Sequence, residues 1–163
     1  MARDRHNQDP EQQARSVALR LLARREHSRF ELELKLRQRK LDAALIDRVL
    51  DDFEEQGWLS DERFADIYAR NRINLRYGPL RIRAELQQKG IRFVPESLAA
   101  ITDRQWCEIA LLARERRFGL ADLRDDWTAR AKQARFLGQR GFSAEQVEHA
   151  LDVKSQEEAG QQG

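Results

Sequence analysis

The sequence predicts an all-α fold in which three tandem three-helix repeats form an elongated, curved helical array. Leu and Ala, with 20 residues each, outnumber Val, Ile and Thr, which total 14. The first pair favours helices, whereas the second group favours strands. Apolar residues also recur at the spacing of amphipathic helices, and one short motif returns about every 50 residues.

The first repeat is expected over residues 14–58. Its first helix, ending near residue 25, follows from apolar residues at helical spacing, namely Ala14, Val17, Ala18, Leu21 and Leu22. Ser28 and Glu31 form a capping-box pattern that opens a second helix, which ends near residue 39. Asp42 can cap a third helix, and Gly57 ends it in the left-handed conformation. The core face of this third helix is expected to be Ile46, Val49, Leu50 and Phe53.

The second repeat is expected over residues 59–103. Ser60 or Asp61 can cap its first helix, and the residues predicted to share one face of that helix are Phe64, Ile67, Tyr68 and Asn71. Pro79 suits the first position of the next helix, which Gly90 closes, with Ile82 and Leu86 facing inward. A short helix then runs from about residue 95 to residue 100.

The third repeat is expected over residues 104–153, with helices over 104–117, 125–139 and 143–152. The apolar residues that mark these helices are Trp106, Ile109, Ala110 and Ala113, then Trp127, Ala131 and Ala134, then Val147, Ala150 and Leu151. Ser143 and Gln146 form a second capping-box pattern at the start of the last helix.

The recurring motif has the form Leu-x-Gln-basic-(Gly or Lys)-apolar, and its copies begin at Leu36, Leu86 and Leu137. Lys40 stands where the other two copies have Gly90 and Gly141. A unit of about 45 residues buries too little surface to be stable alone, so neighbouring repeats must share apolar faces. A single compact bundle of nine helices with a fortuitous motif is the alternative.

Composition excludes several classes of protein. Cys107 is the only cysteine, which excludes a disulfide scaffold, and three scattered histidines cannot complete a Cys/His zinc site. Neither a glycine-rich phosphate loop nor a catalytic constellation is recognisable, so we expect no enzyme activity, cofactor or metal. Residues 1–13 and 154–163 are polar and are expected to be disordered tails. Because we find neither a membrane-span pattern nor a signal peptide, we expect a cytoplasmic protein.

Charge is unevenly distributed, although the formal net charge is only +2. Residues 42–66 contain nine acidic and two basic residues, residues 70–92 seven basic and one acidic, and residues 113–140 eight basic and four acidic. Of the 30 basic residues 25 are arginines, which suit phosphate and carboxylate contacts, although GC-rich codon usage produces the same excess. The basic segments favour an anionic partner, and the alternative is that the acidic first repeat simply neutralises its neighbour.

Two stretches of the chain have distinctive sequences: residues 57–65 read GWLSDERFA and residues 77–91 read YGPLRIRAELQQKGI. Both resemble the RecX family of proteins, which regulate the RecA recombinase. The opening ALRLLA of residues 18–23 and the closing FLGQRGF of residues 136–142 match as well, so the resemblance covers about residues 14–152. It implies three tandem three-helix repeats in a non-enzymatic protein that binds in the groove of the RecA–DNA filament. It also implies inhibition of the ATPase, strand-exchange and co-protease activities of RecA.

We expect a monomer whose basic second and third repeats contact RecA and, weakly, single- or double-stranded DNA. The candidate contact residues are Arg70, Arg72, Arg76, Tyr77, Arg81, Arg83, Lys89, Arg92, Arg130, Lys132, Arg135 and Arg140. Arg63 is expected instead to hold an acidic residue at a junction between repeats. The competing hypothesis is a DNA-binding helical repeat protein that acts without RecA.

Overall fold

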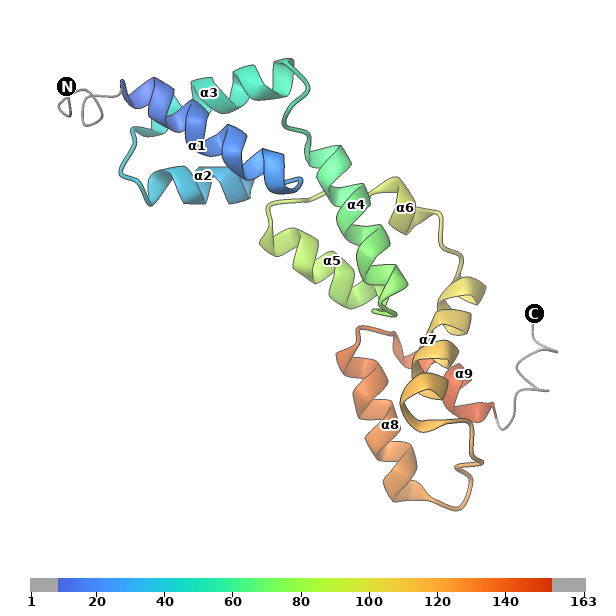
Figure 1. Ribbon diagram of the computed structural model, residues 1–163. Coiled ribbons are helices and arrows are strands. Elements are labelled where there is room, and N and C mark those ends of the chain that lie inside the picture. The colour runs from blue at the N-terminus through green and yellow to red at the C-terminus, as the bar shows by residue number, and fades with distance from the viewer. Residues whose placement is uncertain (1–8, 154–163) are drawn as a thin grey trace. The chain divides into compact units, whose positions relative to one another are not determined.

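A computed structural model describes residues 9–153, and the regular secondary structure in this range is entirely α-helical. The helices in chain order are α1 (Pro10–Arg24), α2 (Arg29–Arg37), α3 (Ala43–Glu55), α4 (Asp61–Asn74), α5 (Pro79–Gln88), α6 (Glu96–Ala99), α7 (Asp103–Phe118), α8 (Trp127–Gln139) and α9 (Ala144–Asp152) (Figure 1). The all-α prediction is therefore confirmed for this range. Of the tails predicted over residues 1–13 and 154–163, residues 1–8 and 154–163 lie outside the described residues, whereas residues 10–13 are helical, contrary to the prediction.

Within residues 9–153 the chain forms two compact units. The first unit comprises residues 9–67 and 87–93, and the second unit comprises residues 68–86 and 94–153. Helices α1, α2 and α3 contact one another in the first unit, as do α7, α8 and α9 in the second. Helix α4 supplies residues 61–67 to the first unit and residues 68–74 to the second.

The core of the first unit lies between α1, α2 and α3. Its buried apolar residues are Ala14, Val17, Ala18, Leu32, Leu36, Ile46, Val49, Leu50, Phe53 and Leu59. The face predicted for α3 is confirmed, and Trp58 packs edge-on against Phe53 with their ring centroids 5.3 Å apart. Gly57 adopts a φ of 79°, the left-handed conformation expected after this helix.

Helix α1 begins at Pro10, four residues before the start predicted at residue 14. The Asp9 side chain accepts a hydrogen bond from the amide of Glu11, and Pro10 occupies the first helical position. Both features are typical of a helix start. The prediction was wrong because it relied on apolar spacing, and the first turn of α1 lies outside the apolar stripe.

The buried faces of α4 and α8 also differ from the predicted ones. On α4, Phe64 is buried as expected, but Ile67 is 42% exposed and Ala65 and Ala69 are buried instead. On α8, Trp127 is 80% exposed, and the buried residues are Gln133 and Leu137 rather than Ala131 and Ala134. Helical spacing within one helix was the basis of both predictions, and it does not specify which face the neighbouring helices cover.

Side-chain caps define most of the helix starts. The capping boxes of Ser28 with Glu31 and of Ser143 with Gln146 are both present, as predicted. A third box, which the sequence interpretation missed, joins Thr102 to Gln105 at the start of α7. At α4 the Ser60 hydroxyl oxygen accepts from the amide of Arg63 at 3.1 Å, so Ser60 provides the side-chain cap there. Asp42 is the N-cap residue of α3, but its side chain makes no capping hydrogen bond.

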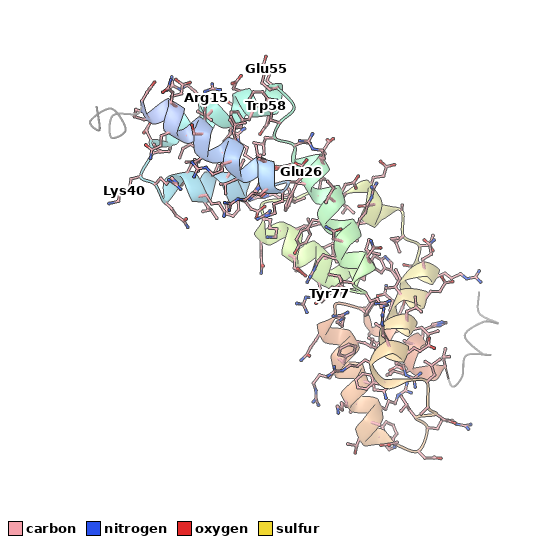
Figure 2. All side chains as sticks on the ribbon, in the orientation of Figure 1. Arg15, Glu26, Lys40, Glu55, Trp58 and Tyr77 are labelled. Carbon is pink, nitrogen blue, oxygen red and sulfur yellow. The ribbon has the colours of Figure 1, made fainter. Side chains whose placement is uncertain are left out.

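The glycines in the second and third copies of the motif lie in close contact with a helix from earlier in the chain. Gly90 has a φ of 80°, and a Cβ added there would lie 2.6 Å from the Cβ of Phe30 in α2. Gly141 has a φ of 100°, and a Cβ there would lie 2.3 Å from the Cβ of Arg81 in α5. Lys40 adopts the same left-handed conformation, with a φ of 62°, but is exposed in the turn after α2 (Figure 2). A side chain is therefore accommodated at residue 40 and excluded at the other two positions.

A fully buried arginine ties the last repeat together. The Arg114 guanidinium donates to Gln133 Oε1 at 2.8 Å and to the main-chain oxygens of Ala150 at 2.9 Å and Ala121 at 2.7 Å. It also donates to the main-chain oxygen of Val153 at 2.5 Å. Two of these carbonyls lie at the C-terminal end of α9, where a cation also complements the helix dipole.

Candidate functional site

Three arginines surround the ring of Tyr77 in the second unit. The guanidinium carbons of Arg72, Arg140 and Arg81 lie 3.7, 4.0 and 4.6 Å from the centroid of the Tyr77 ring. These distances are those of cation–π contacts. Figure 2 shows Tyr77 beside the turn that joins α8 to α9. The structure thus brings together four of the twelve candidate residues, and we call them the Tyr77 cluster.

Main-chain hydrogen bonds position this cluster. The Gly78 amide donates to the carbonyl oxygen of Arg140 at 2.7 Å, and the Leu80 amide donates to that of Gly141 at 3.0 Å. In return, Arg140 Nη2 donates to the carbonyl oxygen of Leu75 at 2.5 Å. The segment after α4 and the turn after α8 are therefore held edge to edge, and the arginine side chains converge on the ring between them.

Glu85 is the carboxylate that pairs with this cluster. It accepts hydrogen bonds from the Tyr68 hydroxyl at 2.5 Å, from Arg72 at 2.8 Å and from Arg81 at 3.3 Å. Burial disfavours the ionised carboxylate, but the bonds from Tyr68 and Arg72 outweigh it, so the pKa of Glu85 lies below its usual value. Burial and the neighbouring carboxylate raise the pKa of Tyr68 to about 12. The Glu85 carboxylate thus pairs with two of the three arginines, and the Tyr77 cluster together with Glu85 keeps a net positive charge.

A basic pocket of about 250 Å³ adjoins the cluster in the second unit. It is lined by Arg76, Ala113, Arg116, Arg117, Phe136 and Arg140. Among these lining residues none carries a carboxylate. The guanidinium carbons of Arg117 and Arg140 each lie 5.6 Å from the centroid of the Phe136 ring.

The candidate set omits two arginines of this pocket, Arg116 and Arg117. Their helical spacing from Ala113 was the available signal, because residues three and four apart share one face of a helix. The other lining arginines, Arg76 and Arg140, lie far from them in sequence, and only the packing of α7 against α8 and the segment after α4 brings the four together.

The remaining candidate residues lie elsewhere. Arg130 pairs with Glu148 at 2.8 Å and with Asp152 at 3.2 Å, so it faces α9 and has a structural role. Lys89 belongs to the first unit, where its Nζ lies 3.6 Å from Glu31. The exposed candidates are Arg70 on α4, Arg83 on α5, Lys132 and Arg135 on α8, and Arg92 in the first unit.

The acidic residues of the first unit are largely paired within it. Arg29 bonds to Glu54 at 2.6 Å and to Asp51 at 2.7 Å, and its amide donates to Asp61 Oδ1 at 2.8 Å. Arg63 pairs with Glu26, which lies after α1, as expected for an arginine that joins two repeats (Figure 2). Ion pairs within the first unit therefore neutralise much of the negative charge of residues 42–66.

Other chemistry has little support among residues 9–153. No group of three or more His, Cys, Asp or Glu side chains in this range could hold a metal ion. Burial raises the pKa of the half-buried Cys107 thiol, and neighbouring carboxylates add to this shift, which is unfavourable for a nucleophile. In the same range no helix combines the length and apolar character that crossing a membrane requires.

Comparison with known proteins identifies the family. Three family models match the chain: "RecX, first three-helix domain" over residues 14–53, "RecX, second three-helix domain" over 60–92 and "RecX, third three-helix domain" over 103–151. Regulatory protein RecX of Halorhodospira halophila is 40% identical over 145 residues, which cover 88% of this chain and 89% of that protein. This chain belongs to the RecX family.

Further RecX proteins support the assignment. Regulatory protein RecX of Pseudomonas fluorescens strain SBW25 is 39% identical over 88% of this chain and 93% of its own length. A crystal structure of RecX from Lactobacillus salivarius has the same fold, with a TM-score of 0.74, 24% identity, and coverage of 88% of this chain and 95% of that one. The three tandem three-helix domains predicted from the sequence are therefore those of a RecX protein, and the relatives named here are regulatory proteins by name.

Proposed function

We propose that this protein binds the RecA–DNA filament in its groove and inhibits the ATPase, strand-exchange and co-protease activities of RecA. Membership of the RecX family supports a regulatory role, and the target follows from the resemblance of residues 57–65 and 77–91 to regulators of RecA. The protein acts by binding, without catalysing a reaction of its own. We further propose that it works as a cytoplasmic monomer with repeats over residues 14–58, 59–103 and 104–153.

The observation that supports this proposal most directly is the excess positive charge of the second unit. Glu85 compensates part of the Tyr77 cluster, while the adjoining pocket adds Arg116 and Arg117 without a lining carboxylate. The DNA in a RecA filament carries a high density of negative charge. Complementary charge on a partner increases the rate and specificity of association. The exposed Arg83, Lys132 and Arg135 would extend the contact beyond the cluster.

The test is RecA ATP hydrolysis on single-stranded DNA, with this protein titrated well below one copy per RecA. An unrelated DNA-binding protein at matched DNA occupancy is the control. We expect substoichiometric inhibition by this protein and none by the control. Inhibition that appears only when the protein covers the free DNA would contradict filament regulation.

A second candidate function is direct DNA binding without RecA, and the arginine-lined pocket is the observation that favours it. Counterion release makes the affinity for DNA fall steeply as salt rises, whereas a shape-complementary contact with protein persists further. Binding to filament and to bare single-stranded DNA should therefore be measured across the same salt series. Equal salt slopes and equal affinities would favour the DNA-binding function over filament regulation.

A further inference from the structure

The basic pocket beside α7 and α8 has the composition of an oxyanion site. Four of its six lining residues are arginines, contributed by α7, by the end of α8 and by the segment after α4. Each guanidinium offers up to five N–H donors in a planar fork that matches the oxygens of phosphate. Arginines from three separate segments therefore converge on a volume of about 250 Å³.

Arg140 is partly buried and lies close to several other arginines. Its Nε is buried and has no hydrogen-bond partner, although Nη2 donates to Leu75. Burial lowers the pKa of Arg140, and the nearby Arg81, Arg72 and Arg76 add to that effect. An anion bound in the pocket would offset the repulsion among these clustered arginines.

The segment after helix α4 places Arg76 at the pocket. Arg76 adopts a φ of 64°, the left-handed conformation that is uncommon for a residue other than glycine. This conformation directs the chain from α4 into the Gly78 contact, while Arg76 lines the pocket. Phe136 forms an apolar wall, and its ring packs edge-on against Phe118 with centroids 5.3 Å apart. Arg117 and Arg140 pack against the Phe136 ring, so these two side chains have less entropy to lose on binding than free arginines.

We propose that this pocket binds a phosphate group, held by Arg76, Arg116, Arg117 and Arg140. A phosphoryl group offers more acceptor oxygens and more negative charge than a carboxylate, and therefore fits four guanidiniums better. The phosphate can belong to a nucleic-acid backbone or to a free phosphoryl compound, because both present the same oxygens. The proposal concerns the second unit alone and holds whether or not the protein regulates RecA.

The test measures binding of inorganic pyrophosphate by titration calorimetry at low, constant ionic strength. We expect the wild-type protein to bind it and both Arg116→Ala and Arg117→Ala to weaken binding at least tenfold. Arg104→Ala is the matched control, because Arg104 is an exposed arginine on the same helix, 3.8 Å from Glu108 in an i,i+4 pair. Circular dichroism confirms that each variant retains its helices.

Two further arms identify the ligand class. Glutamate at tenfold excess over pyrophosphate should not displace it, and displacement would overturn the choice of phosphate over carboxylate. A thymidine oligonucleotide of about 15 nucleotides distinguishes the two sources. Weaker oligonucleotide binding by Arg117→Ala supports a backbone phosphate, whereas unchanged oligonucleotide binding, with pyrophosphate binding lost, supports a free phosphoryl compound.

The proposal is wrong if folded wild-type protein does not bind pyrophosphate, or if Arg104→Ala and Arg117→Ala weaken binding equally. Inhibition of RecA is measured on the same samples. Inhibition that survives without pyrophosphate binding would leave filament regulation standing and remove the pocket. Pyrophosphate binding without any effect on RecA would leave the pocket standing and remove filament regulation.

Discussion

Gly78 and Gly141 approach so closely that neither position has room for a side chain. A Cβ on Gly78 would lie 2.3 Å from the carbonyl carbon of Gly141, and a Cβ on Gly141 would lie 2.6 Å from the amide nitrogen of Arg81. The hydrogen bond from the Gly78 amide to the carbonyl oxygen of Arg140 runs beside this contact. The Tyr-Gly-Pro and Arg-Gly-Phe sequences of the chain therefore meet at one backbone junction within the second unit.

Substitution at this junction should destabilise the second unit. We expect Gly141→Ala to lower the free energy of unfolding by about 2–5 kcal/mol, because left-handed strain adds to overpacking against Arg81. Gly138→Ala, three residues earlier within α8, has no neighbour within 4 Å and should change stability by at most about 1 kcal/mol, in the stabilising direction. Urea unfolding of both variants measures the difference, and equal stabilities would refute the close contact.

Substitutions at the first two copies of the motif should have opposite effects on stability. We expect Lys40→Gly to stabilise the first unit by up to about 1 kcal/mol, because glycine adopts the left-handed conformation without strain. Gly90→Ala should destabilise the same unit by about 2 kcal/mol or more, since its Cβ would overlap with Phe30. Thermal unfolding compares the pair. A Gly90→Ala variant as stable as the parent would contradict the close contact between Gly90 and Phe30.

Arg114 should be one of the most sensitive positions in the third repeat. Arg114→Met keeps an unbranched apolar chain but leaves the carbonyl oxygens of Ala150 and Val153 without their donor. We expect a loss of about 3 kcal/mol or more, the cost of several unsatisfied buried groups. Arg104→Met, on the exposed face of the same helix, should change stability by less than about 0.5 kcal/mol. Denaturant midpoints provide the comparison.

His27 should make the first unit less stable in mild acid. Burial lowers the pKa of His27 below its ordinary 6.5, and the positive charge of Arg25 adds to the shift, although its Nδ1 lies 3.0 Å from the Arg25 carbonyl oxygen. The neutral ring is therefore favoured in the folded state. Its stabilising contribution is complete above the unfolded pKa and is lost as the pH falls through the folded pKa.

The corresponding measurement is the free energy of unfolding between about pH 8 and pH 5.5. We expect stability to fall with decreasing pH in the parent protein. His27→Gln should remove the part of the slope that begins near pH 6.5, because glutamine does not titrate. Superimposable pH profiles for the two proteins would contradict the assigned protonation of His27.

Filament binding should depend on exposed arginines of the second unit. Arg83→Glu reverses an exposed charge on α5, and Arg20→Glu reverses an exposed charge on α1 in the first unit. We expect Arg83→Glu to weaken binding to RecA filaments at least tenfold and Arg20→Glu to weaken it less than twofold. Fluorescence anisotropy on preformed filaments measures both. Arg81 is a poorer choice, because its guanidinium also donates to the Gln139 carbonyl oxygen.

The helices and their caps were predictable because their signals are local. Ser28 with Glu31 and Ser143 with Gln146 are separated by one turn, so the interaction that starts each helix lies within four residues of sequence. The inward faces of α4 and α8 were less predictable. Whether Ala69 or Ile67 is buried depends on the helix packed against it, and the sequence of α4 does not specify that neighbour.

The candidate site was predictable in composition but not in selection. Twelve residues were chosen by their charge or motif, and the structure gathers Arg72, Arg81 and Arg140 on Tyr77, whereas Arg130 turns to α9. Arg116 and Arg117 contribute to the basic segment of residues 113–140 but were not selected as candidates. Their position in a pocket depends on residues from α8 and from the segment after α4.

By itself, the sequence determined the helical class, most helix starts, the three-part repeat and the resemblance to RecX. These follow from side-chain entropy, capping hydrogen bonds and left-handed glycine, which act over a few residues. Only the tertiary structure decided which glycine must lack a side chain and which arginines share a ring or a pocket. Those choices depend on steric overlap and Coulomb interactions between groups such as Gly78 and Gly141, which are far apart in sequence and adjacent after folding.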